Sequence, residues 1–247
     1  MQRIAFVMAM RTEAQPIIDA LGAVLDEPKD DCVLPATWYV AERAGAEVVI
    51  AVNGVDPHHG VDSIATVPAA LTTYETCRRW PVDLIVSAGV AGAWSRCGAQ
   101  VGDVFVSRDR FVYHDRRVDL PGFDVYGVGS FPAVDASRLA EELGFSTGIV
   151  TTSNSLDETD DDRRMIAATG ACVKEMEAAA VADVARLFGV PVMAVKAITD
   201  LVDHHVATAE QFTANLALAT ERLRDALLAV IDWCGPRTVR DLGGGQQ

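Results

Sequence analysis

Acidic residues stand at positions where they could transfer protons or bind hydroxyl groups. Glu175-Met176-Glu177 precedes the alanine-rich run 178–182, and Asp200 follows the apolar run 190–195. An apolar run with β-branched residues predicts a buried strand, and ligands of open α/β sheets bind beyond the carboxyl ends of strands. Each acid taken singly is explained equally well as a cap, a dipole partner or a turn former. Together, on either side of one helix and strand, they favour a functional site.

Glu13 occupies a comparable place near the N-terminus. The apolar run 4–8 predicts a short strand, and Thr12 is a suitable cap for the helical pattern that follows. Glu13 therefore lies just past a strand end and at a helix start, where a simple dipole partner is an equal alternative.

These acids must be positioned by a chain that alternates strands and helices. We expect the strands at 4–8, 37–41, 47–52, 84–87, 102–107, 148–152 and 190–195. Residues 26–36 have a loop composition, and the segment 61–77 has a helical pattern in which Pro68 predicts a kink or an interface feature. No repeat or linker interrupts residues 1–234, so we predict one domain there, followed by a partly disordered tail over residues 235–247.

Composition excludes several classes of partner. The net charge of −14 argues against nucleic acid and anionic membranes, since both are polyanions. Apolar runs of membrane-spanning length and a signal-peptide layout are absent from the sequence. The odd cysteine number and wide spacing predict reduced thiols in a cytoplasmic protein rather than a disulfide framework or a zinc site. These cysteines are Cys32, Cys77, Cys97, Cys172 and Cys234.

Small residues follow the strand at 84–87, in the turn 88–93. Such residues let a ligand approach the backbone closely, but the dinucleotide fingerprint and the P-loop are both missing. The segment 111–131 carries many aromatic rings, which predicts packing against a ligand or a partner subunit. His58-His59 is expected to be a solvated loop rather than a metal site, and His114 a structural histidine.

Five separated motifs occur in the order typical of one known family. They are Ala9-Met10-x-x-Glu13, the turn 88–93, Gly102-Asp103-Val104 with Tyr113-His114-Asp115, Glu175-Met176-Glu177-Ala178, and Ala197-Ile198-Thr199-Asp200. The chain thereby resembles the 5′-methylthioadenosine/S-adenosylhomocysteine nucleosidases of the nucleoside phosphorylase/nucleosidase superfamily, and most of all the plant-type members. The resemblance implies a three-layer α/β/α fold around a mixed, partly barrel-like sheet, a homodimer, and catalysis without a metal or organic cofactor.

The resemblance also implies a role for each site residue. Glu13 would be the general base that deprotonates water, and Asp200 the general acid that protonates purine N7. Glu177 would hold the ribose hydroxyls, with Met176 packed on the sugar. The remaining substrate contacts implied by the resemblance are Met10, Val90, Ala91, Gly92, Ser155, Leu156 and Glu175, with Phe123 and Tyr126 in the pocket for the 5′ substituent, in some relatives across the dimer.

Two alternative functions stay open at this point. A phosphorylase of the same fold needs arginines at the water position, and here the turn 88–93 carries no arginine, although Arg11 lies near Glu13. A non-catalytic nucleoside-binding relative would lack one of the acids, whereas this chain keeps Glu13, Glu177 and Asp200. The apolar loop 120–126 favours 5′-methylthioadenosine over S-adenosylhomocysteine, with futalosine-type nucleosides as a further alternative.

Overall fold

The computed structural model describes residues 1–27 and 32–243. Part of the loop predicted at 26–36 and residues 244–247 of the predicted tail therefore lie outside the described residues. The strands are β1 (Arg3–Met8), β2 (Val24–Asp26), β3 (Thr37–Arg43), β4 (Ala46–Val52), β5 (Leu84–Ala93), β6 (Val104–Tyr113), β7 (Phe131–Pro132), β8 (Ser146–Thr152), β9 (Val173–Glu175) and β10 (Val192–Leu201). The α-helices are α1 (Arg11–Leu21), α2 (Thr66–Arg79), α3 (Phe123–Val128), α4 (Ser137–Leu143), α5 (Asp160–Thr169), α6 (Ala178–Ala185) and α7 (Thr208–Cys234). Short 3-10 helices cover Ser95–Cys97, Arg186–Phe188 and Val239–Leu242.

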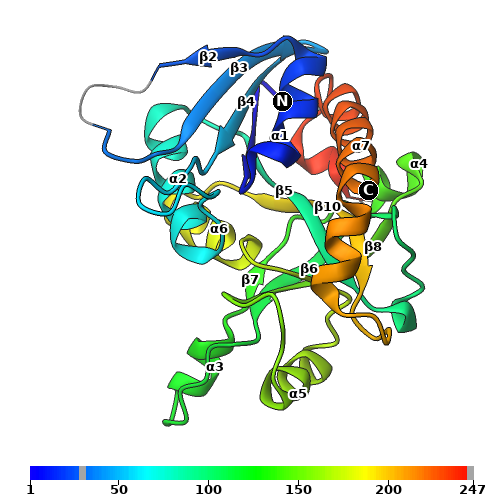
Figure 1. The fold of residues 1–247 in the computed structure, drawn as a ribbon. Helices are drawn as coiled ribbons and strands as arrows, with labels where there is room; N and C mark the ends of the chain where they lie inside the picture. The colour runs from blue at the N-terminus through cyan, green and yellow to red at the C-terminus, as the bar shows by residue number, and fades with distance from the viewer. Residues whose placement is uncertain (28–31, 244–247) are drawn as a thin grey trace.

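The described strands form one mixed sheet that closes on itself at one end. Its order is β10-β6-β8-β9-β5-β1-β4-β3-β2, and β10 also pairs with β5. That extra pairing closes β10, β6, β8, β9 and β5 into a barrel, while β1, β4, β3 and β2 extend from it as an open arm (Figure 1). The expected α/β fold with a mixed, partly barrel-like sheet is confirmed.

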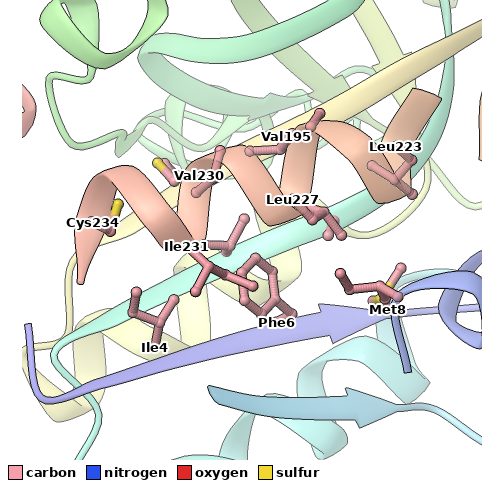
Figure 2. Packing of buried hydrophobic residues seen from close by; sticks show 14 of the residues in the cluster. Ile4, Phe6, Met8, Val195, Leu223, Leu227, Val230, Ile231 and Cys234 are labelled. Atoms are coloured by element: carbon pink, nitrogen blue, oxygen red, sulfur yellow. The ribbon is translucent and has the colours of Figure 1, made fainter. Parts of the chain in front are cut away.

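Helices cover both faces of the open part of the sheet. In β1, Ile4, Phe6 and Met8 belong to the core under α1 and α7, whereas Ala5 and Val7 belong to the core under α2 and α6. This division follows from the two-residue period of a strand. Figure 2 shows the side chains of α7 packed over those of β1. A strand buried on both faces must be apolar throughout, which explains the continuous apolar runs in the sequence.

The helix predicted at 61–77 is shorter at its start than expected. It begins at Thr66, so Pro68 falls in the first turn of α2, where a proline fits without a kink. In the first turn a backbone N–H has no intrahelical partner, and a proline there loses no hydrogen bond. The preceding residues form the loop that brings Ile64 and Ala65 toward the cavity described below.

The prediction of five reduced thiols was wrong for one pair. Cys97 and Cys172 form a disulfide with Cα atoms 5.8 Å apart, whereas Cys32, Cys77 and Cys234 are free. The two cysteines are 75 residues apart in sequence, so their spacing gave no signal. They meet because Ala93 at the end of β5 pairs with Val173 at the start of β9.

Residues 235–243 continue from α7 onto the body of the molecule. Leu242 is fully buried in the core under α7, and the Met1 ammonium donates a hydrogen bond to the carbonyl of Gly235 at 3.1 Å. Within the described residues, no helix combines the length and the apolar character that a membrane span requires.

Candidate active site

A cavity of about 380 Å³ opens where β1, β5, β9 and β10 end. All the site residues expected from the sequence line it except Phe123 and Tyr126. The lining comprises Ala9, Met10, Glu13, Ile64, Val90, Ala91, Gly92, Ser155, Leu156, Lys174, Glu175, Met176, Glu177, Thr199, Asp200, Thr208 and Phe212.

Glu13 is held firmly in the first turn of α1. Its carboxylate accepts hydrogen bonds from the backbone N–H of Val90 at 2.7 Å and of Met10 at 3.1 Å. A β-carbon placed on Gly89 would lie 3.1 Å from Oε1 of Glu13, so the glycine gives the carboxylate room against β5. Burial raises the pKa of Glu13, and the two amides and Lys196 partly offset this. Glu13 is thus a fixed carboxylate with an elevated basicity, suited to accept a proton.

Asp200 differs because one of its oxygens is unused. Oδ1 accepts a hydrogen bond from the Thr199 hydroxyl at 2.7 Å, whereas the buried Oδ2 has no partner among the described residues. A β-carbon on Gly92 would lie 2.5 Å from Oδ2, closer than atoms can approach. Burial raises the pKa of Asp200, opposed by the Thr199 hydrogen bond and the charge of Lys174. A buried carboxyl group with a free oxygen is suited to carry a proton and donate it.

Glu13 and Asp200 approach β5 from opposite faces. Gly89 and Gly92 are three residues apart in this strand, so their β-carbon directions point to opposite sides. The pairing of β10 with β5 shifts by one residue at Thr199, which places Asp200 opposite Gly92. Bulges of this kind often redirect side chains next to active sites. The strand end 90–92 therefore lies between the two carboxyl groups.

Glu177 faces the cavity from the N-cap of α6. Its Oε1 accepts a hydrogen bond from the backbone N–H of Ala65 at 2.8 Å, and Ala65 has a positive φ of 74°. Burial, followed by the charge of Glu175, raises the pKa of Glu177 to about 7. A carboxylate beside an open cavity can accept hydrogen bonds from neighbouring hydroxyl groups of a ligand.

Glu175 lines the same cavity, but its oxygens are already occupied. Oε2 accepts hydrogen bonds from the backbone N–H groups of Glu177 at 3.0 Å and Ala178 at 2.8 Å, and pairs with Lys196 at 3.0 Å. Oε1 accepts a hydrogen bond from the hydroxyl of Thr152. Glu175 therefore fixes the backbone that presents Glu177.

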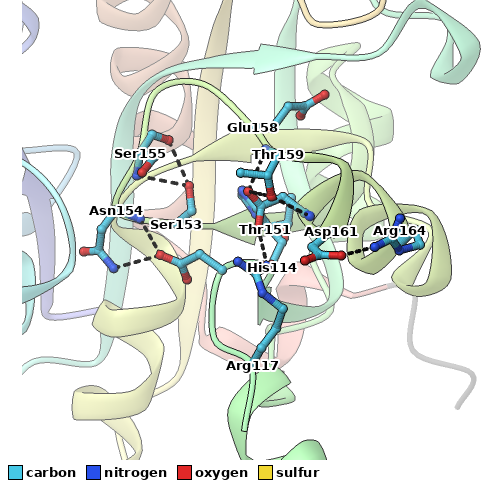
Figure 3. A network of polar contacts seen from close by, with 12 residues as sticks. His114, Arg117, Thr151, Ser153, Asn154, Ser155, Glu158, Thr159, Asp161 and Arg164 are labelled. Atoms are coloured by element: carbon cyan, nitrogen blue, oxygen red, sulfur yellow. Dashed lines mark hydrogen bonds and ion pairs between the residues drawn. The ribbon is translucent and has the colours of Figure 1, made fainter. Parts of the chain in front are cut away.

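The loop that carries Ser155 and Leu156 is held by hydrogen bonds within the loop and to neighbouring segments. The Ser153 hydroxyl donates to the carbonyl of Ser155 at 2.9 Å, and Asn154 donates twice to Asp115, as Figure 3 shows for the surrounding network. The ammonium of Lys174 donates to the carbonyl of Leu156 at 2.8 Å. These contacts leave Ser155 and Leu156 at the cavity wall in a defined geometry.

Phe123 and Tyr126 lie elsewhere. Both are in α3, which projects away from the sheet (Figure 1), and they are 53% and 65% exposed. Their rings contact each other, with centroids 6.3 Å apart. The expectation that these residues line the pocket is therefore not met within a single subunit, because α3 follows β6 outward instead of turning back over the cavity.

Several lining residues were not singled out from the sequence. Lys174 directly precedes Glu175 in β9, and its position next to the acidic motif was a usable signal. Phe212 and Thr208 belong to the first turns of α7, and Ile64 to the loop before α2, regions whose approach to the strand ends depends on tertiary packing. In the part of the chain described, no group of three or more His, Cys, Asp or Glu side chains is arranged to hold a metal ion.

Comparisons with known proteins place the chain in a family. A family model described as the phosphorylase superfamily matches residues 3–232. A 5′-methylthioadenosine nucleosidase of Arabidopsis thaliana is 39% identical, with 97% of this chain and 90% of the relative covered. A 5′-methylthioadenosine/S-adenosylhomocysteine nucleosidase of the same plant is 38% identical, with coverage of 97% and 94%.

A solved structure agrees with these relatives. The apo structure of an Arabidopsis thaliana 5′-methylthioadenosine nucleosidase superposes with a TM-score of 0.93 at 37% identity, covering 97% of this chain and 98% of that one. The resemblance inferred from the five motifs is thereby confirmed. The chain belongs to the phosphorylase superfamily and, within it, to the 5′-methylthioadenosine/S-adenosylhomocysteine nucleosidases.

Proposed function

We propose that this protein hydrolyses the N-glycosidic bond of 5′-methylthioadenosine, releasing adenine and the 5-methylthio sugar. The observation that carries the proposal is the placement of Glu13 and Asp200 on opposite faces of the end of β5, with Oδ2 of Asp200 unoccupied by the described residues. Hydrolysis with a water on one side of the sugar and a leaving base on the other needs two carboxyl groups so arranged.

Each residue has a defined part in the reaction. Glu13 accepts a proton from water as the oxygen bonds to the anomeric carbon. The carbon–nitrogen bond breaks, and Asp200 donates its proton to N7 of the departing purine. Glu177 accepts hydrogen bonds from the ribose diol, which orients the sugar and favours its developing positive charge. Each proton transfer contributes roughly 10²–10⁴-fold to the rate.

A phosphorylase reaction is disfavoured by the lining of the cavity. A phosphate dianion needs arginines or free amide groups, and among the described residues no arginine lines the cavity. Arg11 is exposed, Lys174 is engaged with the carbonyl of Leu156, and the amides of Met10 and Val90 already bind Glu13. The carboxylate of Glu13 would also repel phosphate.

We also propose a preference for the methyl substrate over S-adenosylhomocysteine. Part of the cavity wall is apolar and is formed by Met10, Ile64, Leu156 and Phe212. An apolar pocket favours the binding of an alkyl group by about 1–3 kcal/mol. The charged tail of S-adenosylhomocysteine would need polar partners, which Lys174 cannot supply while it is bound to the loop. The relatives named above include both specificities, so only kinetics decides between them.

The test is adenine release in phosphate-free buffer. We expect turnover of 5′-methylthioadenosine without phosphate, no stimulation when phosphate is added, and a lower kcat/KM for S-adenosylhomocysteine. A rate that depends on phosphate and yields a sugar 1-phosphate would make the protein a phosphorylase. Binding without turnover would make it a nucleoside-binding relative, and equal kcat/KM values would remove the substrate preference.

We further propose a cytoplasmic homodimer that acts in methionine salvage. The face formed by α2 and the 3-10 helix Arg186–Phe188 exposes Val67, Leu71, Tyr74 and Leu187, a group of apolar side chains suited to a second copy of this chain. The solution mass measured by light scattering tests the assembly, and a monomer at micromolar concentration contradicts it.

A further inference from the structure

A lysine is buried behind the sugar side of the cavity. Lys196 is 2% exposed and lies in β10 directly opposite Gly89 of β5. Paired residues of neighbouring strands project to the same face of a sheet. The Lys196 side chain therefore runs along the face where the carboxylate of Glu13 rests over Gly89, although Lys196 does not itself line the cavity.

The contacts of Lys196 connect it to the backbone of Glu177. Its ammonium lies 3.0 Å from Oε2 of Glu175 and donates to the hydroxyl of Ser87 at 3.2 Å. The same Oε2 accepts the backbone N–H groups of Glu177 and Ala178. The ammonium of Lys196, the carboxylate of Glu175 and the first backbone N–H groups of α6 are thus connected by direct contacts.

The surroundings of Lys196 are otherwise acidic. Glu13 faces it from α1, Glu175 from β9 and Glu177 from the start of α6. Asp62, in the loop after β4, has a negative charge that raises the pKa of Glu13. Carboxylates that share a buried region disfavour one another's ionisation. Although burial lowers the pKa of Lys196, the charges of Glu175 and Glu177 raise it, so the lysine stays protonated.

We propose that Lys196 is a positioning residue whose ammonium holds Glu175 against the backbone of Glu177 and lets Glu13 and Glu177 face the sugar together as anions. The proposal rests on the nucleosidase function given above. Lys196 and Glu175 form a pair of zero net charge, so the ammonium does not repel the positive charge that develops on the sugar. Glu13 and Glu177 then supply the negative field that this charge requires.

The first experiment measures kcat/KM for 5′-methylthioadenosine from about pH 5.5 to 9 in the wild type, Lys196→Met and Lys196→Arg. Since Lys196 lowers the pKa of Glu13 and of Glu177, its removal raises both, and the acid limb of the profile moves to higher pH. We expect Lys196→Met to lose about tenfold more activity near pH 6 than near pH 9. Lys196→Arg keeps the positive charge, so the acid limb of its pH profile should lie close to that of the wild type.

Lys174→Met is the matched control. Lys174 is also a buried lysine, 6% exposed, but its charge acts on Asp200 and not on the Glu13 side. We expect this variant to leave the acid limb at its wild-type position, even though its activity falls. An acid limb that stays in place in Lys196→Met, or that moves equally in both variants, overturns the proposal.

A second readout is independent of turnover. The pKa of Glu177 is raised in the folded state, so the stability connected with it is lost as pH rises through that value, and more so without Lys196. The deficit in Tm of Lys196→Met should therefore be larger near pH 8 than near pH 5.5, where the carboxylates take up protons. A deficit equal at both pH values indicates a packing role only and overturns the proposal.

This readout separates failure of the two proposals. If the wild type does not hydrolyse 5′-methylthioadenosine, the proposed function fails, while the melting comparison still tests Lys196. If Lys196→Met does not fold, the double variant Lys196→Met/Glu175→Gln is used, since removing both members of the ion pair leaves neither of them buried without its partner. The proposal expects the double variant to fold and to melt with a pH dependence close to wild type; a double variant that is equally unfolded contradicts it.

Discussion

The two ends of the cavity treat a carboxyl group in opposite ways. At the end where we propose that the sugar binds, the two oxygens of Glu13 accept hydrogen bonds from backbone N–H groups, which favours the anion and fixes its direction. At the end where we propose that the purine binds, Asp200 has one hydroxyl donor and one oxygen free of partners among the described residues. Both groups rest on glycines of β5, yet Asp200 lies closer. The same functional group, a buried carboxyl, is thus suited either to accept or to donate a proton according to how many hydrogen-bond donors surround it.

The largest effects should come from neutralising each carboxyl group. Asp200→Asn removes the proton that the leaving purine needs, so we expect turnover to fall by about 10²–10⁴-fold while 5′-methylthioadenosine still binds. Glu13→Gln should lower turnover by a similar factor. In addition it should lower Tm, because an amide N–H₂ would face the backbone N–H of Met10 or Val90.

Kinetics, calorimetric binding and thermal melting of both variants check this contrast. Turnover of Asp200→Asn at the wild-type rate would remove Asp200 from the mechanism. Equal Tm values for the two variants would show that the amide contacts do not distinguish the two ends.

An intermediate effect is expected from the two glycines. In Gly92→Ala the new β-carbon would lie 2.5 Å from Oδ2 of Asp200, so the carboxyl group must move. In Gly89→Ala the nearest atom, Oε1 of Glu13, is at 3.1 Å and needs to shift by only a few tenths of an ångström. Because a displacement near 1 Å costs about 10²-fold, we expect kcat to fall by about 10–100-fold in Gly92→Ala and by less than about tenfold in Gly89→Ala.

Measuring kcat and KM for both alanine variants tests the role of β5 as the support of both carboxyl groups. The reverse order of the two losses would show that close approach at Gly92 is not important for catalysis.

The smallest effect should follow from Thr199→Val, which preserves shape but removes the hydroxyl bound to Asp200. That hydrogen bond lowers the pKa of Asp200, so its loss raises the pKa and keeps the group protonated to higher pH. We expect kcat to change by less than about tenfold, because Asp200 is protonated before it reacts and a hydrogen bond between neutral groups contributes only about 0.5–1.5 kcal/mol. The alkaline limb of the pH–rate profile should move upward, and a downward movement would contradict the assignment of Asp200 as the acid.

The sequence was most informative where chemistry sits at the end of a strand. Asp200 and Glu175-Met176-Glu177 follow or form strand ends, and such ends meet at one edge of a sheet. The fold could also be predicted, because the apolar runs and the order of the five family motifs are both visible in the sequence itself. The role of Lys196 could not be predicted, because it is a single charged residue in a largely apolar strand and the sequence does not show which residues it contacts.

Features that depend on three-dimensional pairing could not be predicted. The Cys97–Cys172 disulfide exists because β5 and β9 pair, and the sequence does not reveal that pairing. Phe123 and Tyr126 were placed near the pocket by analogy, while the direction in which α3 leaves the sheet is decided by its packing. The one-residue shift at Thr199 is equally hidden, since β10 is buried on both faces and its sequence has no alternation of polar and apolar residues that an extra residue would interrupt.

That shift matters for anyone who would transplant this motif into another scaffold. In a regular strand, Lys196 and Asp200 are four residues apart and would project from the same face. On that face the aspartate would lie on the same side of β5 as Glu13, so no carboxyl group would face the opposite side, where we propose that the leaving base is protonated. The extra residue at Thr199 turns Asp200 to the other face, opposite Gly92. A designed enzyme that copied the letters from Lys196 to Asp200 onto an unbulged strand would therefore reproduce the motif and lose its acid.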